Sequence, residues 1–307
     1  MIYVFVLFAV TAVWGWTFVL VKDAISQYPV APFLALRFAL AVLVMLPIAR
    51  HFPGRRALRV GGIIGIAVAL GYALQTYGMQ DTSPGVAGLI TGLFVVFTPL
   101  IDHFFGARIP PRTVAAVATA LLGTALLAGT GGGPVVSAGD LLVLAGAVFF
   151  AVQIVLLSRL GPGLSAADLA AVQMAVCFVV FSAGGSTTFR APSGIVWFAV
   201  VITGVFASAL AFFLQAWAQK YLSATRAALI MAMEPAWALF FAVILTGERL
   251  NAVQGVGAGL VLLAVAGHEA VPLLSGGDGS SAGRHGRGGV AGDGGGRPGR
   301  HARRLQR

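Results

Sequence analysis

Ten long apolar runs determine what this chain can fold into. A helix rises about 1.5 Å per residue, so about 20 apolar residues cross the roughly 30 Å hydrocarbon core of a bilayer. The runs cover residues 2–21, 30–49, 60–79, 84–101, 113–128, 141–157, 169–184, 194–218, 227–246 and 252–268. A backbone in lipid must satisfy its polar groups internally, so such runs form helices. The sequence therefore predicts an all-α integral membrane protein with ten transmembrane helices.

The composition and the distribution of charge agree with this prediction. The chain is 58% hydrophobic and 10% charged, whereas soluble domains are about 25% charged. Of its twenty Lys and Arg residues, sixteen fall in the tail and in the loops on one side of the runs, and three on the other side. Positive loops stay in the cytoplasm, so both termini are predicted to be cytoplasmic in a plasma or inner membrane. The net charge of +10 thus indicates a membrane surface rather than nucleic acid.

The chain contains an internal repeat. Residues 74–90 align with residues 214–230 at a constant offset of 140, with identities at Leu74, Gln75, Ser83, Ala87, Leu89 and Ile90. Each repeat holds five runs, an odd number, so the second repeat must enter the membrane from the opposite side. Inverted repeats occur in many secondary transporters, with the substrate site near the midplane. The predicted parts are a first five-helix repeat at 1–129, an extracytoplasmic linker at 130–138, a second five-helix repeat at 139–268, and a disordered Gly/Arg-rich cytoplasmic tail at 269–307.

Four features of the sequence resemble one group of membrane proteins. They are Trp14-Gly15 in the first run, Arg37 in the second, Met233-Glu234-Pro235 in the ninth, and the turn Gly247-Glu248-Arg249-Leu250 after it. Within a ten-span frame they resemble the drug/metabolite transporter superfamily, and in particular its EamA-type ten-helix transporters. The first repeat departs from this pattern, with Ala107 where the second has Glu248. The resemblance implies a solute carrier, usually an exporter of amino acids, metabolites or drugs.

Glu234 is the acid that lies deepest in an apolar run. An ionised acid near the bilayer centre costs about 2.5–3.5 kcal/mol on insertion scales unless it is paired or faces a wet cavity. One interpretation is a carboxylate that couples transport to protons or binds substrate. The alternative is a neutral acid hydrogen-bonded to backbone carbonyls that Pro235 leaves free.

Arg37 is the one basic residue well inside a run. Its guanidinium stays protonated in almost any environment. It could hold a substrate carboxylate in a forked pair or act as the counter-ion of Glu234. The alternatives are a structural ion pair and a side chain that extends to the outer interface.

Amides and aromatic residues complete the predicted site. Gln75, Gln173 and Gln215 must point away from lipid, either to bind a polar substrate or to bond between helices. If the repeats are inverted, Gln75 should lie toward the outer face and Gln215 toward the inner face. The candidates for the wall of the cavity are Trp14, Tyr72, Tyr77, Phe94, Trp217 and Trp237.

No motif for catalysis or for a cofactor was found in the sequence. The glycine-rich loop at 129–133 lacks the Gly-Lys-Ser/Thr ending of a phosphate loop. The single cysteine, Cys177, lies inside an apolar run. We therefore expect no catalytic residue, no metal and no cofactor. The expected function is proton-coupled export of a small molecule by alternating access. The alternatives are an uncoupled facilitator and, from another class, a membrane-embedded enzyme or a non-transporting scaffold.

The expected partners are a small-molecule substrate, protons and the lipid bilayer, without nucleic acid. Gly255 and Gly259 form a pair of small residues four positions apart, which lets helix backbones approach closely. This pair favours packing within the bundle or dimerisation, so a monomer and a homodimer both stay open.

Overall fold

The computed structural model describes residues 2–128, 137–185, 189–246 and part of 252–267. The chain divides into a unit of Met1–Glu269 and a second unit of Ala270–Arg307. Helices occupy most of the described residues, and those residues include no β-strand. The Gly247-Glu248-Arg249-Leu250 turn, most of the predicted linker and the predicted tail lie outside the described residues.

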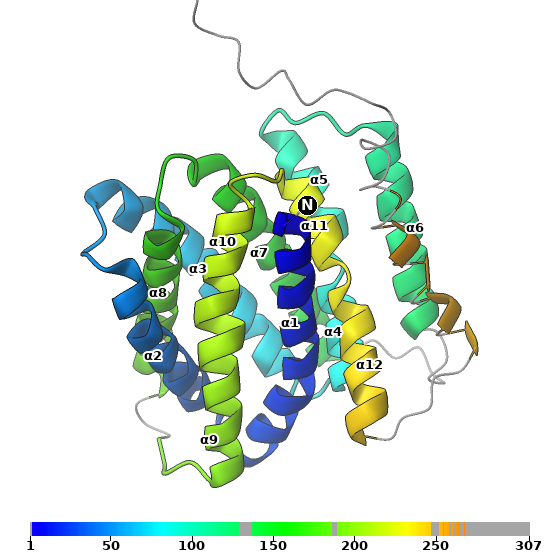
Figure 1. Ribbon diagram of the computed structural model, residues 1–307. Coiled ribbons are helices and arrows are strands. Elements are labelled where there is room, and N and C mark those ends of the chain that lie inside the picture. The colour runs from blue at the N-terminus through cyan, green and yellow to red at the C-terminus, as the bar shows by residue number, and fades with distance from the viewer. Residues whose placement is uncertain are drawn as a thin grey trace, which may run out of the picture. The chain divides into compact units, whose positions relative to one another are not determined.

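The described helices follow the predicted apolar runs. In chain order they are α1 (Ile2–Gln27), α2 (Val30–Ala49), α3 (Arg55–Gly78), α4 (Pro84–Thr91), α5 (Phe94–Phe104), α6 (Pro111–Ala128), α7 (Ala138–Leu160), α8 (Ala166–Gly185), α9 (Gly194–Val201), the π-helix η1 (Ile202–Leu210), α10 (Ala211–Ala218), α11 (Ala224–Met231) and α12 (Glu234–Thr246) (Figure 1). Among the described residues, eight stretches are long and apolar enough to cross a membrane, and each matches a predicted run. The 18-residue α6 covers the fifth run, and a shorter apolar helix, Gly255–Ala264, falls in the tenth.

Large apolar side chains occur both inside and outside the bundle. Phe33 and Phe38 of α2 are fully buried, whereas Leu43 and Leu46 of the same helix are more than half exposed. Val179 of α8 is also more than half exposed. A soluble monomer rarely exposes large apolar patches. These outward faces are suited to lipid tails, which explains why the helices are apolar around most of their circumference.

Two of the membrane-crossing stretches are interrupted near their middle. The pair α4 and α5 forms one stretch, the pair α11 and α12 forms the other, and two residues separate the helices in each pair. At the breaks, amides bond to carbonyls three residues back, from Leu93 to Ile90 at 3.1 Å and from Met233 to Ile230 at 3.3 Å. Pro235 has no amide hydrogen and so contributes to the second break. The apolar runs at 84–101 and 227–246, which the sequence predicts as single helices, are therefore each two short helices.

The two breaks lie against each other. A Cβ atom on Gly92 would lie 2.5 Å from Cγ of Pro235, and one on Gly88 would lie 2.9 Å from Cβ of Ala238. On either side of this contact, α4 packs against α12 and α5 packs against α11. The interrupted stretches thus cross where the helices are broken, and glycine at position 92 allows the close approach.

The π-helix η1 positions side chains of α1 and α2. It runs for nine residues between α9 and α10, and π-helical segments occur frequently at functional sites. The indole Nε1 of Trp14 donates to the carbonyl of Ala207 at 2.8 Å, and Nε of Arg37 donates to Oγ of Ser208 at 2.8 Å. A Cβ on Gly204 would lie 2.8 Å from the Arg37 carbonyl, so α2 and η1 are packed backbone to backbone.

The bundle has two ends, which α7 connects. A Cβ on Gly78, at the end of α3, would touch the carbonyl of Gly139 at the start of α7. Gln219, directly after α10, bonds instead to the last two turns of α7. We call the first end the Lys22 end, which includes the turn at 79–82, and the second the Arg159 end, which includes the turn at 219–222.

Candidate functional site

A cavity lies at the centre of the described helices. Its volume is about 50 Å³, enough for about four water molecules. Side chains from α1, α2, α3, α4, α5, α7, α10, α11 and α12 line it, so both predicted repeats contribute. Its charged side chains are Arg37 and Glu234, its amides are Gln75, Gln153 and Gln215, and its aromatic side chains include Trp14, Tyr72, Phe94, Phe150 and Phe212.

Arg37 lies at the cavity with only 2% of its surface exposed. Its Nη2 donates to the hydroxyl of Tyr72 at 3.0 Å, and its guanidinium lies 4.4 Å from the centroid of the same ring. Together with the bond to Ser208, these contacts fix the plane of the guanidinium. Within the described residues no carboxylate lies within ion-pair distance of it. Two of the alternatives for Arg37, an ion pair with Glu234 and an extension to the outer interface, are therefore not found among the described residues.

Glu234 is the first residue of α12 and sits directly after the break in its membrane-crossing stretch. It is 5% exposed and lines the cavity. The N-terminal position on a helix favours a negative charge. In the part of the chain that the structure describes, its carboxylate makes no hydrogen bond and no ion pair. One of the two interpretations of Glu234 was a neutral acid bonded to the carbonyls that Pro235 leaves free. These bonds are not found among the described residues.

The amides at the cavity bond to side chains of neighbouring helices. Gln75 donates to Oγ1 of Thr91 at 2.9 Å. Gln153 and Gln215 exchange amide hydrogen bonds at 3.4 and 3.2 Å. Gln173 accepts from Gln153 at 3.3 Å but lies outside the lining of the cavity. Of the three candidate amides, Gln75 and Gln215 thus face the cavity, and Gln173 supports Gln153 from behind.

The six aromatic candidates separate into two groups. Trp14, Tyr72 and Phe94 line the cavity. The other three do not, which corrects the expectation from the sequence. Tyr77 is 42% exposed on the outside of α3, Trp217 packs against Tyr3 and Tyr221, and Trp237 packs against Phe8, Phe240 and Phe241.

Several lining residues were not among the candidates. Phe150, Phe212 and Thr91 line the cavity, and Ser208 holds Arg37. The repeat offset of 140 could have identified Phe212, because it is the counterpart of Tyr72. No signal in the sequence distinguishes Phe150 from the other aromatic residues of its run.

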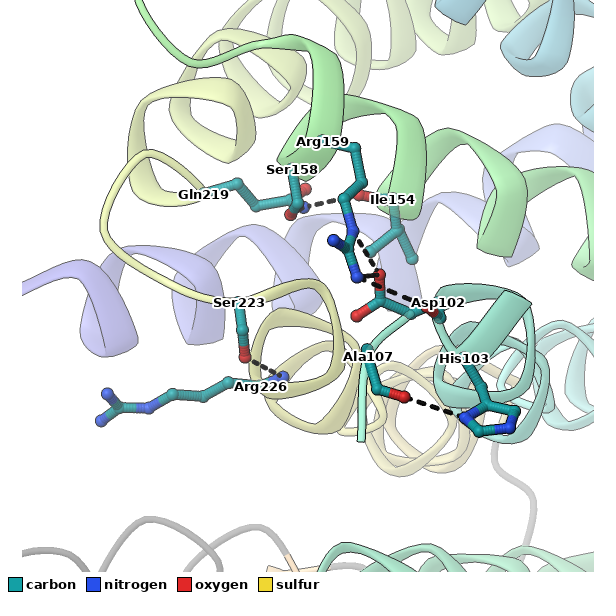
Figure 2. Close-up of polar contacts among 9 residues, drawn as sticks. All are labelled: Asp102, His103, Ala107, Ile154, Ser158, Arg159, Gln219, Ser223 and Arg226. Atoms are coloured by element: carbon teal, nitrogen blue, oxygen red, sulfur yellow. Dashed lines mark hydrogen bonds and ion pairs between the residues drawn. The ribbon is translucent and has the colours of Figure 1, made fainter. Parts of the chain in front are cut away.

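The two ends of the bundle are closed by different contacts. At the Lys22 end, Nζ of Lys22 donates to the carbonyls of Met79 at 2.6 Å, Gln80 at 3.0 Å and Thr82 at 3.1 Å. At the Arg159 end, Nε of Arg159 donates to Oδ1 of Asp102 at 2.7 Å (Figure 2). Lys22 therefore closes the turn after α3 through backbone groups, whereas Arg159 joins α7 to α5 through a side-chain ion pair.

The arrangement defines a class of protein before any comparison. A helical bundle with apolar outer faces encloses a small cavity lined by Glu234 and Arg37, and neither has a partner of opposite charge in the described part of the chain. The described residues contain no cluster of three or more His, Cys, Asp or Glu that could hold a metal ion. This is a multi-pass membrane protein with an internal polar binding cavity.

Comparison with known proteins identifies the family. The EamA-like transporter family matches residues 1–129 and 137–268. The chain belongs to this family. It is 33% identical over 260 residues to an uncharacterized transporter of Archaeoglobus fulgidus, covering 83% of this chain and 82% of that protein. It is 24% identical over 268 residues to the uncharacterized inner membrane transporter YedA of Escherichia coli K12, covering 84% of this chain and 88% of YedA.

A chain of known crystal structure has the same fold. The two superpose with a TM-score of 0.75 at 20% sequence identity, covering 88% of this chain and 98% of the other. At this identity the similarity supports the fold alone. The family match and the named relatives, not this structure, identify the protein as a transporter, and they fit the drug/metabolite transporter superfamily.

Proposed function

We propose that this protein is a secondary transporter that moves a small zwitterion, such as an amino acid with an apolar side chain, through the central cavity by alternating access. The observation that carries the proposal is the pair of Arg37 and Glu234. Both line one cavity, and neither has a partner of opposite charge among the described residues. A substrate carboxylate would bind Arg37 in a charge-assisted bond, and a substrate ammonium would bind Glu234.

The rest of the cavity fits the apolar part of such a substrate. Trp14, Tyr72, Phe94 and Phe212 supply aromatic walls, and pockets for small molecules combine apolar walls with a few placed polar groups. The volume of about 50 Å³ is too small for a substrate of this kind. The cavity must therefore widen when it binds, as expected of a carrier whose central site opens to one side and then to the other.

Ten helices in two inverted repeats are part of the proposal. The family match consists of two stretches of similar length. The breaks at residues 92–93 and 232–233 are separated by the same offset of 140 as the sequence repeat. Ser83 and Ser223, at the same offset, each cap a helix by accepting from the amide three residues later. Gln75 lies three residues before the end of α3, which is at the Lys22 end of the bundle. Gln215 lies three residues before the end of α10, which is at the Arg159 end.

Glu234 provides a mechanism for coupling to protons. One carboxylate can hold either a proton or a substrate ammonium, but not both. If it releases one as it takes the other, substrate and proton move in opposite directions across the membrane. With both termini in the cytoplasm, as the distribution of Lys and Arg predicts, the inward proton gradient would drive export.

The test is transport in proteoliposomes with three compounds that share one side chain. Phenylalanine carries both charges, phenethylamine only the ammonium and 3-phenylpropanoate only the carboxylate. We expect transport of phenylalanine and exclusion of the other two. Loss of one partner of a buried charge pair costs about 2–5 kcal/mol, so Arg37→Met and Glu234→Gln should each lower the rate at least about 30-fold.

Arg190→Gln is the matched control, because Arg190 lies in an exposed position and does not line the cavity. It should leave transport unchanged. Transport of the amine or the acid at the rate of phenylalanine would show that the cavity does not select for two charges, and the substrate class would be wrong.

A further inference from the structure

A second pocket lies at the Arg159 end. Its volume is about 510 Å³, ten times that of the central cavity. It is lined by the connection between α7 and α8 at 161–165, by Leu157 and Leu169, and by Ala216, Gln219 and Lys220. Among the described residues that line it, Lys220 is the one with a charged side chain. A pocket of this size can hold a whole small molecule.

Gln219 lies between this pocket and the central cavity. Its side chain is 5% exposed and lines the second pocket. Its Oε1 accepts from Nε2 of Gln215 at 2.9 Å, and Gln215 lines the central cavity. Its Nε2 donates to the carbonyl of Ile154 at 3.0 Å and to Oγ of Ser158 at 2.8 Å. Figure 2 shows this side chain extending from the end of α10 to α7.

Gln219 and its hydrogen bonds separate the second pocket from the central cavity, and we call this barrier the partition. All groups in these hydrogen bonds are neutral. Gln219 makes three side-chain hydrogen bonds, two to α7 and one to Gln215 of α10, and rotation of this one side chain breaks all of them. A polar solute or water can replace each bond, because an amide, a hydroxyl and a carbonyl bond equally well to such groups. Opening at this point needs no separation of the Arg159–Asp102 ion pair, which joins α7 to a different helix, α5.

The other end is closed by a different kind of contact. Met79 occupies the position of Gln219 at the repeat offset of 140. Its side chain is 1% exposed and lines the central cavity, and its carbonyl accepts from Lys22. A thioether cannot exchange strong hydrogen bonds with a passing polar group. Met79 and Gln219 thus occupy equivalent positions in the two repeats, but only the side chain of Gln219, at the Arg159 end, can exchange hydrogen bonds with a polar substrate.

We propose that the 510 Å³ pocket is the vestibule through which substrate reaches or leaves the central cavity, and that Gln219 is the gate between them. The gate opens when a polar substrate takes over the bonds of Gln219 to Gln215 and α7. The vestibule role rests on the proposed transport function, whereas the partition by Gln219 is a property of the protein without substrate.

The test measures access to the cavity with a thiol reagent and no substrate. The chain has one cysteine, Cys177, which is buried, so Cys177→Ala gives a background without thiols. Met231→Cys places a reporter in the cavity lining. A membrane-impermeant methanethiosulfonate is added to proteoliposomes. The exposed positions Lys220 and Asp23, changed to cysteine one at a time, report which end of the bundle faces the reagent.

Gln219→Ala should raise the labelling rate of the reporter from the Arg159 end about tenfold, because it removes both the side chain that fills the partition and its three hydrogen bonds. Ser158→Ala removes one bond and should give a smaller increase. Lys220→Arg is the matched control, since it changes a side chain of the same pocket, keeps its charge and leaves the three bonds of Gln219 in place, so it should leave the rate unchanged. Labelling from the Lys22 end should not change in any of the three.

The proposal is overturned if Gln219→Ala labels at the rate of Lys220→Arg, or if its rate rises equally from both ends. Should Gln219→Ala not fold, Gln219→Met provides the second measurement. The methionine side chain fills the partition as that of Met79 does at the other end, so the reporter should label at the original rate while transport of phenylalanine becomes slower. Transport by Gln219→Met at the full rate would show that Gln219 is not the gate. Failure of the unmodified protein to carry phenylalanine rejects the substrate class and leaves the labelling result intact.

Discussion

Arg159 and Asp102 form an ion pair, with Nε and Nη2 of the arginine both 2.7 Å from Oδ1 of the aspartate (Figure 2). The pair joins the last turn of α7 to the last turn of α5. The Asp102 side chain is 10% exposed and that of Arg159 is 37% exposed. An ion pair in such a position is partly screened by solvent, so its contribution to stability is modest.

Asp102→Asn should therefore lower the melting temperature in detergent by about 2–4 °C, which corresponds to a loss of about 1 kcal/mol. Arg159→Gln should give a similar decrease, and the double variant should be no less stable than the worse single variant, because the two changes remove the same contact. Arg56→Gln serves as control, since Arg56 is exposed and makes only a 3.4 Å bond to the carbonyl of Pro162. Additive decreases in the double variant would mean that the two residues act independently.

The helices that cross the bundle could be predicted from the sequence, but the breaks in them could not. The run at 30–49 predicts α2 with the bounds that the structure has, Val30–Ala49. The break at 92–93 lies in apolar sequence, whereas the break at 232–233 comes directly before Glu234 and Pro235. Proline alone does not identify a break, because Pro47 and Pro99 lie inside α2 and α5. The shared cause is tertiary, because each break is where one stretch packs against the other, as the contact of Gly92 with Pro235 shows.

The candidate site was predictable in its chemistry and less so in its geometry. Arg37 and Glu234 stand out in apolar sequence, and both line the cavity. Tyr77 and Trp217 are each two residues beyond a cavity glutamine, Gln75 or Gln215, and two residues rotate a helix by about 200°. Both aromatic residues therefore face away from the cavity, and helical periodicity alone could have excluded them.

Gly92→Ala should destabilise the protein. The added methyl group would lie 2.5 Å from Cγ of Pro235, where the backbones of α4 and α12 leave no room. Overpacking of this kind costs about 1–3 kcal/mol, which should appear as a lower melting temperature in detergent. Gly85→Ala is the matched control in α4, the helix that ends directly before Gly92, since a Cβ there meets nothing within 4 Å. Equal melting temperatures of the two variants would contradict the close crossing of the broken stretches.

Tyr72→Phe should weaken substrate binding without abolishing transport. The change removes the hydroxyl that accepts from Arg37 Nη2 at 3.0 Å but leaves the ring beside the guanidinium. A hydrogen bond to a charged group is worth about 1.5–3 kcal/mol, and part of this is recovered by water, so KM for phenylalanine should rise about tenfold. Tyr77→Phe, which changes an exposed hydroxyl outside the cavity, should leave KM unchanged. An unchanged KM for Tyr72→Phe would indicate that the orientation of Arg37 does not matter for binding.

Exchange of one proton for one substrate at Glu234 has a definite sign. If the vesicle interior is more acidic than the medium, protons leave as phenylalanine enters. Because phenylalanine has no net charge, each exchange moves one charge, so valinomycin and equal K⁺ on both sides hold the membrane potential at zero. A gradient of one pH unit then corresponds to about 1.4 kcal/mol, so substrate should accumulate inside up to about tenfold. Reversing the gradient should deplete the interior instead, and a protonophore should abolish both effects. An uncoupled facilitator would equilibrate at a ratio of one under all three conditions.

Glu234→Gln separates coupling from binding, because the amide keeps the shape of the side chain and cannot carry a proton. Transport by this variant should not depend on the pH gradient in either direction. Any residual transport should stop when the phenylalanine concentrations inside and outside the vesicles are equal. Asp102→Asn is the control, since it removes an acid that is paired with Arg159 and lies outside the cavity, and it should still accumulate phenylalanine. If Glu234→Gln accumulated phenylalanine to the original level, another group would have to bind and release the transported proton. In that case Glu234 would retain only the role of ammonium ligand, and the common site for proton and substrate would be wrong.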